Sequence, residues 1–152
     1  MSRRRTRVWW HNSVLQRAFE RQARVVHPDL VSTFDSTRYR LCLAVPVPGY
    51  EARAVEIMFS GNSKAPRVYA DGPTASPHRY ADEALCMWHP RDPIEQRWVR
   101  KDGLRALIAL IVEHLFREAW WRDTGGRDGG EWLGPEAPHA PTSPEGIASC
   151  SS

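Results

Sequence analysis

The segment that most constrains the fold is Leu104–Trp121, a helix-forming stretch that is apolar around most of its circumference. Its core stripe, at helical spacing, consists of Leu104, Leu107, Ile108, Ile111, Leu115 and Ala119. Leu110, Val112 and Phe116 widen this stripe, so the first half of the helix needs cover on nearly all sides. Asp102 is expected to cap its N-terminus. No apolar run in the chain reaches the ~18 residues that span a bilayer, and no membrane partner is expected.

Two upstream segments show the alternation of apolar and polar residues that is typical of β-strands. Arg38–Val47 is the clearer one, and Ala52–Phe59 follows it after a turn of proline and glycine. A third, shorter strand is expected at Pro66–Tyr69. Short connections favour pairing between successive strands, so the sequence predicts an antiparallel meander.

A first helix is expected to begin at Asn12 and to stop at His27, because proline follows. Ser13 and Gln16 have the spacing of a capping box. One face at helical spacing carries Val14, Leu15, Ala18, Phe19, Gln22 and Val25. Arginines line the opposite side, so the apolar face is predicted to be the buried one.

The positive charge of the chain lies at its N-terminal end. Residues 1–24 contain seven arginines against one acid, and the remaining residues contain 14 basic against 17 acidic side chains. The body of the protein is therefore no basic platform for nucleic acid. We divide the chain of 152 residues into a basic arm (1–11), one domain (12–134) and a tail expected to be disordered (135–152).

The chain has three cysteines, Cys42, Cys86 and Cys150, an odd number that cannot form a closed set of disulfides. No apolar core follows the basic start, so the pattern of a secretory signal is missing. Both observations favour a reducing, cytoplasmic location. Cys42 falls in a predicted strand and Cys150 in the tail, which leaves Cys86 as the candidate nucleophile.

Cys86 lies in a segment without clear periodicity, residues 71–102, which contains four prolines. Irregular segments of this length inside a domain are often functional. His78 precedes the cysteine by eight positions, and Asp82 and Glu83 stand between them. A cysteine in such a segment is expected to be exposed, which a nucleophilic thiol requires.

The order of elements and the residues around Cys86 resemble the ubiquitin-conjugating enzyme family over roughly residues 13–122. Pro66-Arg67-Val68 matches the entry to the family's last strand, and His78 stands about where the family has a histidine. Leu85-Cys86 matches the hydrophobic-cysteine pair of the family. The resemblance implies an α+β fold with an N-terminal helix, an antiparallel meander sheet, an irregular active-site loop with the cysteine, and a long C-terminal helix.

Two features around the loop set this chain apart from most of that family. Trp88 and Pro90 still resemble the Trp-x-Pro that often follows the cysteine, but Arg79-Tyr80 replaces the family's Pro-Asn. The asparagine credited with oxyanion stabilisation is therefore missing, and the spacing from histidine to cysteine is shorter. Both features look like the divergent bacterial members of the fold that belong to cyclic-oligonucleotide (CBASS) antiphage systems.

The resemblance implies a reaction and a set of catalytic residues. Cys86 would carry the C-terminus of a protein as a thioester and pass it to an amine, or keep it as an adduct. His78 or the hydroxyl of Tyr80 would take the place of the missing asparagine. Asp82 or Glu83 would accept a proton from the amine or orient it. No cofactor is expected.

The resemblance also implies partners. The protein carried would be a cGAS-like nucleotidyltransferase, with a ubiquitin-activating-like enzyme as a possible second partner. The first helix docks the activating enzyme in the conjugating fold, so Arg17, Arg21 and Arg24 are expected to bind a protein rather than nucleic acid, and Trp88 is placed in the same partner-binding set.

Three alternatives stay open at the level of sequence. The first is a non-catalytic docking module of the same fold. The second is a cysteine hydrolase that pairs Cys86 with His114 or His139. The third is a zinc site in which Cys86 and His89 are joined by Cys42 or His78, although the paired Cys-x-x-Cys units typical of zinc are missing from the sequence.

Overall fold

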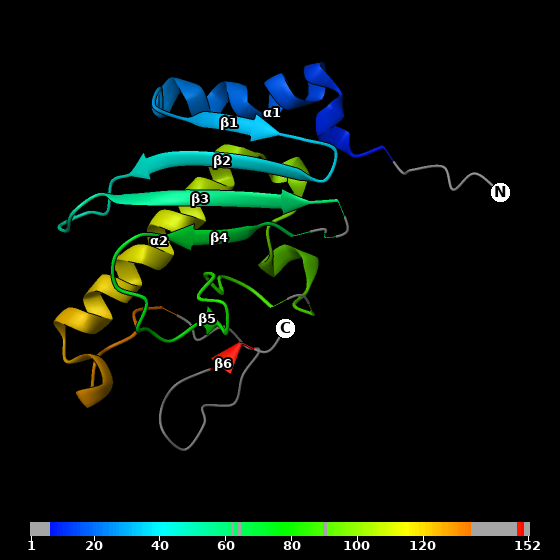
Figure 1. The fold of residues 1–152 in the computed structure, drawn as a ribbon. Coiled ribbons are helices and arrows are strands. Elements are labelled where there is room, and N and C mark those ends of the chain that lie inside the picture. Colours follow the sequence, from blue (N-terminus) through cyan, green and yellow to red (C-terminus); the bar gives the residue numbers. More distant parts are fainter. Residues whose placement is uncertain (1–6, 62, 64, 90, 135–148, 151–152) are drawn as a thin grey trace.

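A computed structural model describes residues 7–61, 63, 65–89 and 91–134, and residues 149–150 as backbone. The architecture is α+β, with an N-terminal helix, a four-stranded antiparallel sheet and a long C-terminal helix that crosses behind the sheet (Figure 1). The fold class is confirmed at this level. The predictions made for the start of the arm, for Pro90, for His139 and for most of the tail lie outside the described residues.

The first helix begins where the sequence predicts it. After a 3-10 turn, η1 (Trp9–His11), comes α1 (Ser13–Val26), and Asn12 is its N-cap. The Asn12 Oδ1 accepts hydrogen bonds from the backbone N–H groups of the second and third helical residues, at 3.0 and 3.3 Å. The cap is therefore Asn12, in place of the capping box expected from Ser13.

The prediction of which face of α1 is buried is wrong. Val14 and Val25 are 73% and 83% exposed, whereas Glu20 is 5% exposed. The Tyr39 hydroxyl donates a hydrogen bond to the Glu20 carboxylate, and Arg24 forms an ion pair with it at 2.7 Å. A carboxylate with such partners can be buried, so α1 turns most of its apolar stripe outward, and Phe19 is the member of that stripe that packs against the core.

The sheet is an antiparallel meander in the order β1-β2-β3-β4. Its strands are β1 (Val31–Phe34), β2 (Arg38–Val45), β3 (Arg53–Ser60) and β4 (Arg67–Ala70). The last three confirm the predicted strands within two residues at each end. The sequence did not predict β1, an edge strand that is largely exposed and shows no alternation of burial.

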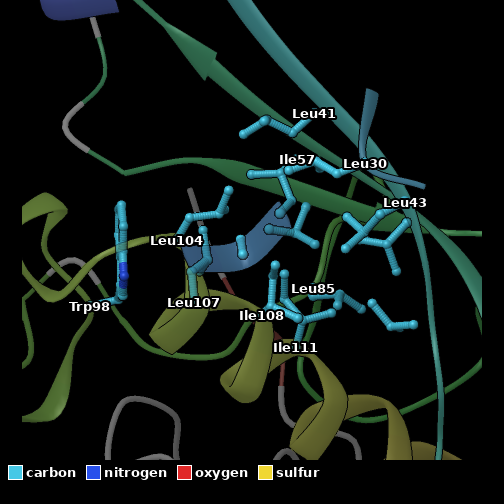
Figure 2. Packing of buried hydrophobic residues seen from close by; sticks show 14 of the residues in the cluster. Leu30, Leu41, Leu43, Ile57, Leu85, Trp98, Leu104, Leu107, Ile108 and Ile111 are labelled. Atoms are coloured by element: carbon cyan, nitrogen blue, oxygen red, sulfur yellow. The ribbon is translucent and has the colours of Figure 1, made fainter. Parts of the chain in front are cut away.

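Helix α2 (Leu104–Asp123) supplies the other half of the core. Leu107 and Ile111 are fully buried, and they face Leu41 of β2 and Ile57 of β3 (Figure 2). Burying a side chain of this size stabilises a fold by roughly 1.5–3 kcal/mol. The predicted core stripe is confirmed, but the expectation that the first half of this helix is buried on nearly all sides is wrong, because Arg105 and Ala109 are exposed.

The N-cap of α2 differs from the prediction. Asp102 lies in the 3-10 turn η3 (Arg100–Asp102), and its carboxylate accepts a hydrogen bond from the backbone N–H of Val99 at 2.9 Å. The N-cap is Gly103, which has a φ of 86°. This left-handed conformation suits glycine and explains why the chain can turn sharply into the helix here.

The segment between β4 and α2 is mostly irregular, as predicted. It holds the short strand β5 (Arg79–Tyr80), the turn η2 (Ile94–Gln96) and η3. Strand β5 pairs in parallel with β6 (Ser149–Cys150), below β4 in Figure 1. After α2 comes one more turn, η4 (Gly126–Asp128). None of the described helices is long and apolar enough to cross a membrane.

Candidate functional site

Residues 78–86 form a tight hairpin that brings the predicted histidine and cysteine together. The backbone N–H of Cys86 donates to the carbonyl of His78 at 2.8 Å, and Arg79 pairs with Leu85 in an antiparallel bridge. The hairpin closes at Tyr80, whose backbone exchanges hydrogen bonds with Ala84 and Glu83 at 2.9 Å. We call this segment the Cys86 hairpin.

Two residues of the hairpin, one at its start and one in its turn, adopt unusual backbone conformations. His78 has a φ of 59° and Glu83 a φ of 70°, and they alone among the described non-glycine residues have a positive φ. Such conformations cost free energy and persist where surrounding contacts enforce them. The hairpin is also joined to the main sheet, because the Leu85 N–H donates to the Val68 carbonyl of β4 at 2.8 Å.

The environment of Cys86 differs from the expectation in two ways. The residue is 1% exposed, so the predicted exposure is wrong. It is also disulfide-bonded, whereas Cys42 is free. The odd cysteine count required only that one thiol stay free, and it could not show which. A disulfide sulfur must be reduced before it can act as a thiolate nucleophile.

A cavity of about 320 Å³ adjoins the hairpin. It lies between the end of β3, the start of β4 and the hairpin, and its wall includes Ser60, Arg67, Tyr80, Leu85 and Met87. The residues on both sides of Cys86 in the sequence, Leu85 and Met87, therefore contribute to it. Cys86 itself is 1% exposed and does not line this cavity.

Tyr80 is half-buried in the wall of this cavity. The Arg67 guanidinium stacks over its ring at 4.4 Å, and its hydroxyl donates to the Trp88 carbonyl at 3.4 Å. Burial raises the pKa of Tyr80 above its ordinary value, an effect that the charge of Arg67 only partly opposes. The phenol therefore keeps its proton at neutral pH and is a hydrogen-bond donor.

Asp82 and Glu83 lie at the exposed tip of the hairpin. The Tyr69 hydroxyl donates to Asp82 at 2.9 Å, and Arg67 lies 3.4 Å from the same carboxylate. Desolvation raises the pKa of Asp82, but these partners and a backbone N–H outweigh it and leave the pKa below its ordinary value. Glu83 accepts a hydrogen bond from the Thr74 hydroxyl at 3.2 Å.

The strongest electrostatic feature of the region is Glu118 on α2, which the sequence analysis did not single out. Its carboxylate is fully buried and accepts two hydrogen bonds from Arg79, at 2.6 and 2.7 Å. The Ser76 hydroxyl donates a third at 2.8 Å, and His114 Nε2 lies 3.3 Å away. One sequence signal existed: Glu118 follows Leu115 at a spacing that keeps it on the buried stripe.

These partners determine the protonation state of Glu118. Burial alone raises the pKa of a carboxyl group, but the hydrogen bonds and charges of Arg79 and His114 outweigh this effect and lower the pKa of Glu118 to about 2. The group is therefore a carboxylate at neutral pH. It forms a buried ion pair with Arg79, whose side chain is 6% exposed.

The histidines of this region pack around one tryptophan. The ring of Trp132 lies 4.8 Å from the His78 ring and 5.4 Å from the His114 ring, measured between centroids. Both histidines are 4% exposed. Trp132, which follows η4, thus packs between His78 of the hairpin and His114 of α2.

The predicted partner-binding residues lie in two places. Arg17 and Arg21 are exposed on α1, and Arg24 binds Glu20 and, through one N–H, the Leu30 carbonyl at 2.7 Å. Trp88 is 7% exposed and belongs to the hydrophobic core. Most of its side chain is therefore turned away from the surface that a partner would contact.

Comparison with known proteins does not assign the chain to a family. No family model, curated protein or solved structure matches it. Within the described part of the chain, no three His, Cys, Asp or Glu side chains lie close enough together to hold a metal ion. The ligand set of the zinc alternative is therefore not assembled there.

Proposed function

We propose that this protein is a cysteine-dependent acyl carrier with a fold of the ubiquitin-conjugating type, acting in a bacterial CBASS-type antiphage system. The observation that carries the proposal is the Cys86 hairpin. It holds Cys86 and His78 in backbone contact, next to a cavity, after a four-stranded meander and before the long helix. This is the order of parts that the resemblance in the sequence implies.

The proposed reaction begins once a cellular dithiol has reduced the disulfide of Cys86 and has itself become a disulfide. The Cys86 thiolate attacks the activated C-terminal carbonyl of a cGAS-like nucleotidyltransferase, and the activating group leaves with the electron pair of its bond. The product is a thioester. An amine then attacks the thioester carbonyl, an amide forms, and the thiolate of Cys86 is released.

The geometry favours distinct roles for the polar residues. Tyr80 keeps its proton and lines the cavity, so its hydroxyl, once it turns from the Trp88 carbonyl, is the better donor to an oxyanion that forms there. His78 packs against Trp132, which leaves it a positioning role unless that contact opens. Asp82 has a lowered pKa, so it attracts and orients an amine rather than accepting its proton. Glu83, exposed beside it, is then the candidate base.

Partner binding is proposed for the outer surface of α1 and β1. Six of the seven large hydrophobic residues that are exposed in the described part of the chain lie there: Val14, Leu15, Val25, Val26, Val31 and Phe34. Arg17 and Arg21 lie on the same helix. Apolar side chains next to unpaired arginine charge suit an acidic protein surface better than nucleic acid. A cytoplasmic location is part of this proposal.

The decisive experiment is intact mass spectrometry of the reduced protein, co-expressed with a cGAS-like nucleotidyltransferase of a CBASS system. We expect an adduct of the two chains that survives a phosphine reductant, which would cleave a disulfide, and that hydroxylamine releases, as it does a thioester. Cys86→Ala should abolish this adduct, and the matched variant Cys42→Ala should retain it. An adduct that survives in Cys86→Ala would contradict the proposal.

One alternative, a non-catalytic docking module of the same fold, is favoured by a specific observation. Cys86 is buried and disulfide-bonded, and the chain lacks the family's asparagine after the histidine. A docking module predicts that Cys86→Ala binds the partner as tightly as the unchanged protein and supports defence equally well. A loss of defence in Cys86→Ala with binding intact would exclude this alternative.

A further inference from the structure

The Cys86 hairpin has few regular hydrogen bonds of its own, so something else must hold it against the domain. Only two residues, Arg79 and Tyr80, are in a strand, and three residues at the tip are exposed. Leu85 holds one side of the hairpin to the core and to Val68 of β4, but the exposed tip has no such contacts, and segments of that kind ordinarily open at low free-energy cost. Yet the hairpin holds two residues at positive φ and keeps Cys86 buried.

The Arg79 guanidinium bridges the hairpin and the long helix. Its Nε and one terminal nitrogen donate to the two oxygens of Glu118, at 2.6 and 2.7 Å. Its other terminal nitrogen donates to the backbone carbonyl of Glu83 at 2.7 Å. The planar guanidinium of Arg79 therefore connects the turn of the hairpin to the buried face of α2.

The helix end of this bridge is fixed. Glu118 is fully buried, and Ser76, which comes just before the hairpin, donates to the same carboxylate at 2.8 Å. Arg122, one turn further along α2, lies 3.6 Å from its other oxygen. The charge of Arg79 is thus matched at a site closed to water, where an ion pair is screened little.

We propose that the pair of Arg79 and Glu118 is a positioning device that keeps the Cys86 hairpin closed and thereby controls access to the Cys86 sulfur. Neither residue touches the reacting atoms: Arg79 acts through the turn at Glu83, and Glu118 acts through Arg79. The proposal deepens the proposed function and rests on it for its catalytic meaning, but access to Cys86 can be measured without any acyl donor.

The test measures alkylation of individual cysteines in the folded protein. The full chain is reduced with dithiothreitol, freed of reductant under anaerobic conditions and pulsed with iodoacetamide, and peptide mapping then gives separate rates for Cys86 and Cys42. Because Cys42 is a half-buried thiol on β2, outside the hairpin, it is an internal reference for changes in alkylation that are not specific to the hairpin.

We expect Glu118→Gln, which removes the charge and keeps the size, to raise the alkylation rate of Cys86 about tenfold or more through local opening, with the Cys42 rate unchanged. The matched control is Glu113→Gln, which makes the same change in an exposed ion pair on the same helix, with Arg117 at 2.6 Å. This control should leave both rates within about twofold of the unchanged protein.

Arg79→Lys is the second variant, and it keeps the experiment decisive if Glu118→Gln does not fold. Lysine retains the charge but cannot donate to both Glu118 oxygens and to the Glu83 carbonyl in one plane, so an intermediate rate at Cys86 is expected. Two results would overturn the proposal: an unchanged Cys86 rate in the folded variants, or equal increases at Cys86 and Cys42.

These experiments test the positioning role of Arg79 and Glu118 separately from the acyl-transfer function. Faster alkylation of Cys86 in Glu118→Gln, together with no adduct in the unchanged protein, would support the positioning role and refute the proposed chemistry. If the adduct forms normally but the alkylation rate of Cys86 is the same in Glu118→Gln, only the positioning role of Arg79 and Glu118 is refuted.

Discussion

The buried carboxylate of Glu118 stabilises the folded state only because the residues around it neutralise its charge and donate hydrogen bonds to it. The carboxylate has no exposed surface, and it is tolerated because Arg79, Ser76 and His114 surround it. Leaving either member of a buried ion pair without its partner costs far more than losing a pair at the surface. The contrast on this molecule is with Arg67 and Asp82, which lie 3.4 Å apart and are both well exposed.

The first prediction at this scale concerns pH. The folded-state pKa of Glu118 is about 2, below the ordinary 4.5, so its contribution to stability is complete above pH 4.5 and is lost as the pH falls toward 2. Glu118→Gln should therefore lower the free energy of unfolding by roughly 3–5 kcal/mol at pH 7. Urea unfolding should show this difference shrinking between pH 5 and pH 3.

A difference between the two proteins that stays constant from pH 7 to pH 3 would show that the lost stability comes from packing rather than from the charge of Glu118. Glu113→Gln is again the matched control. Its ion pair is exposed, so we expect a change within about 0.5 kcal/mol at each pH.

Helix α1 is the element whose sequence pattern and whose packing disagree. An apolar stripe on a surface helix normally faces the core, yet here the stripe containing Val14 and Val25 faces outward. Contact with the sheet falls on Phe19, whose ring lies 5.8 Å from that of Phe59, and on the buried Glu20, which accepts a hydrogen bond from Tyr39.

The prediction at the scale of elements compares the two faces of α1. Val25→Ser changes an exposed position, so we expect the free energy of unfolding to move by less than about 0.5 kcal/mol. Ala23→Leu adds volume at a position with no exposed surface and should cost about 1–3 kcal/mol. Urea unfolding of both variants makes the comparison.

Loss of stability in Val25→Ser equal to that in Ala23→Leu would contradict the assigned orientation of α1. The partner proposal adds a second measurement on the same helix. Arg17→Glu combined with Arg21→Glu should weaken binding of the nucleotidyltransferase and leave the midpoint of thermal unfolding unchanged.

The whole molecule has one core, shared by the sheet and α2. The cluster of buried residues runs from Trp10 through the inner faces of β2 and β3 to Leu115, and it also includes Leu85 of the hairpin (Figure 2). The candidate site is therefore attached directly to the core. Unfolding of the sheet and of α2 is expected to be a single event, because neither has another surface on which to bury its apolar face.

The prediction at this scale uses Leu107, which is fully buried between α2 and the sheet. Leu107→Ala should cost roughly 2–5 kcal/mol, the loss of buried side-chain atoms plus a cavity. Circular dichroism, which follows the helices, and tryptophan fluorescence should report the same lowered midpoint of unfolding. Two separate transitions would show that the helices and the sheet do not share one core.

The sequence by itself determined the order and extent of the main elements. The alternation in β2 and β3, the apolar repeat of α2 and the turn residues between them are local patterns, and local backbone geometry makes them predictive. The same holds for the place of His78 and Cys86 in one irregular segment, although not for their burial. Strand β1 was missed because a short exposed edge strand has no periodicity to detect.

Only the tertiary structure decided which faces and which charges are buried. The outward stripe of α1, the buried ion pair of Glu118 with Arg79, and the oxidised state of Cys86 each depend on residues that are far apart in the chain. From sequence alone, a glutamate in a helix is expected to be exposed, because burying its carboxylate without partners costs free energy. Arg79 lies 39 positions away from Glu118, and no local pattern links the two residues.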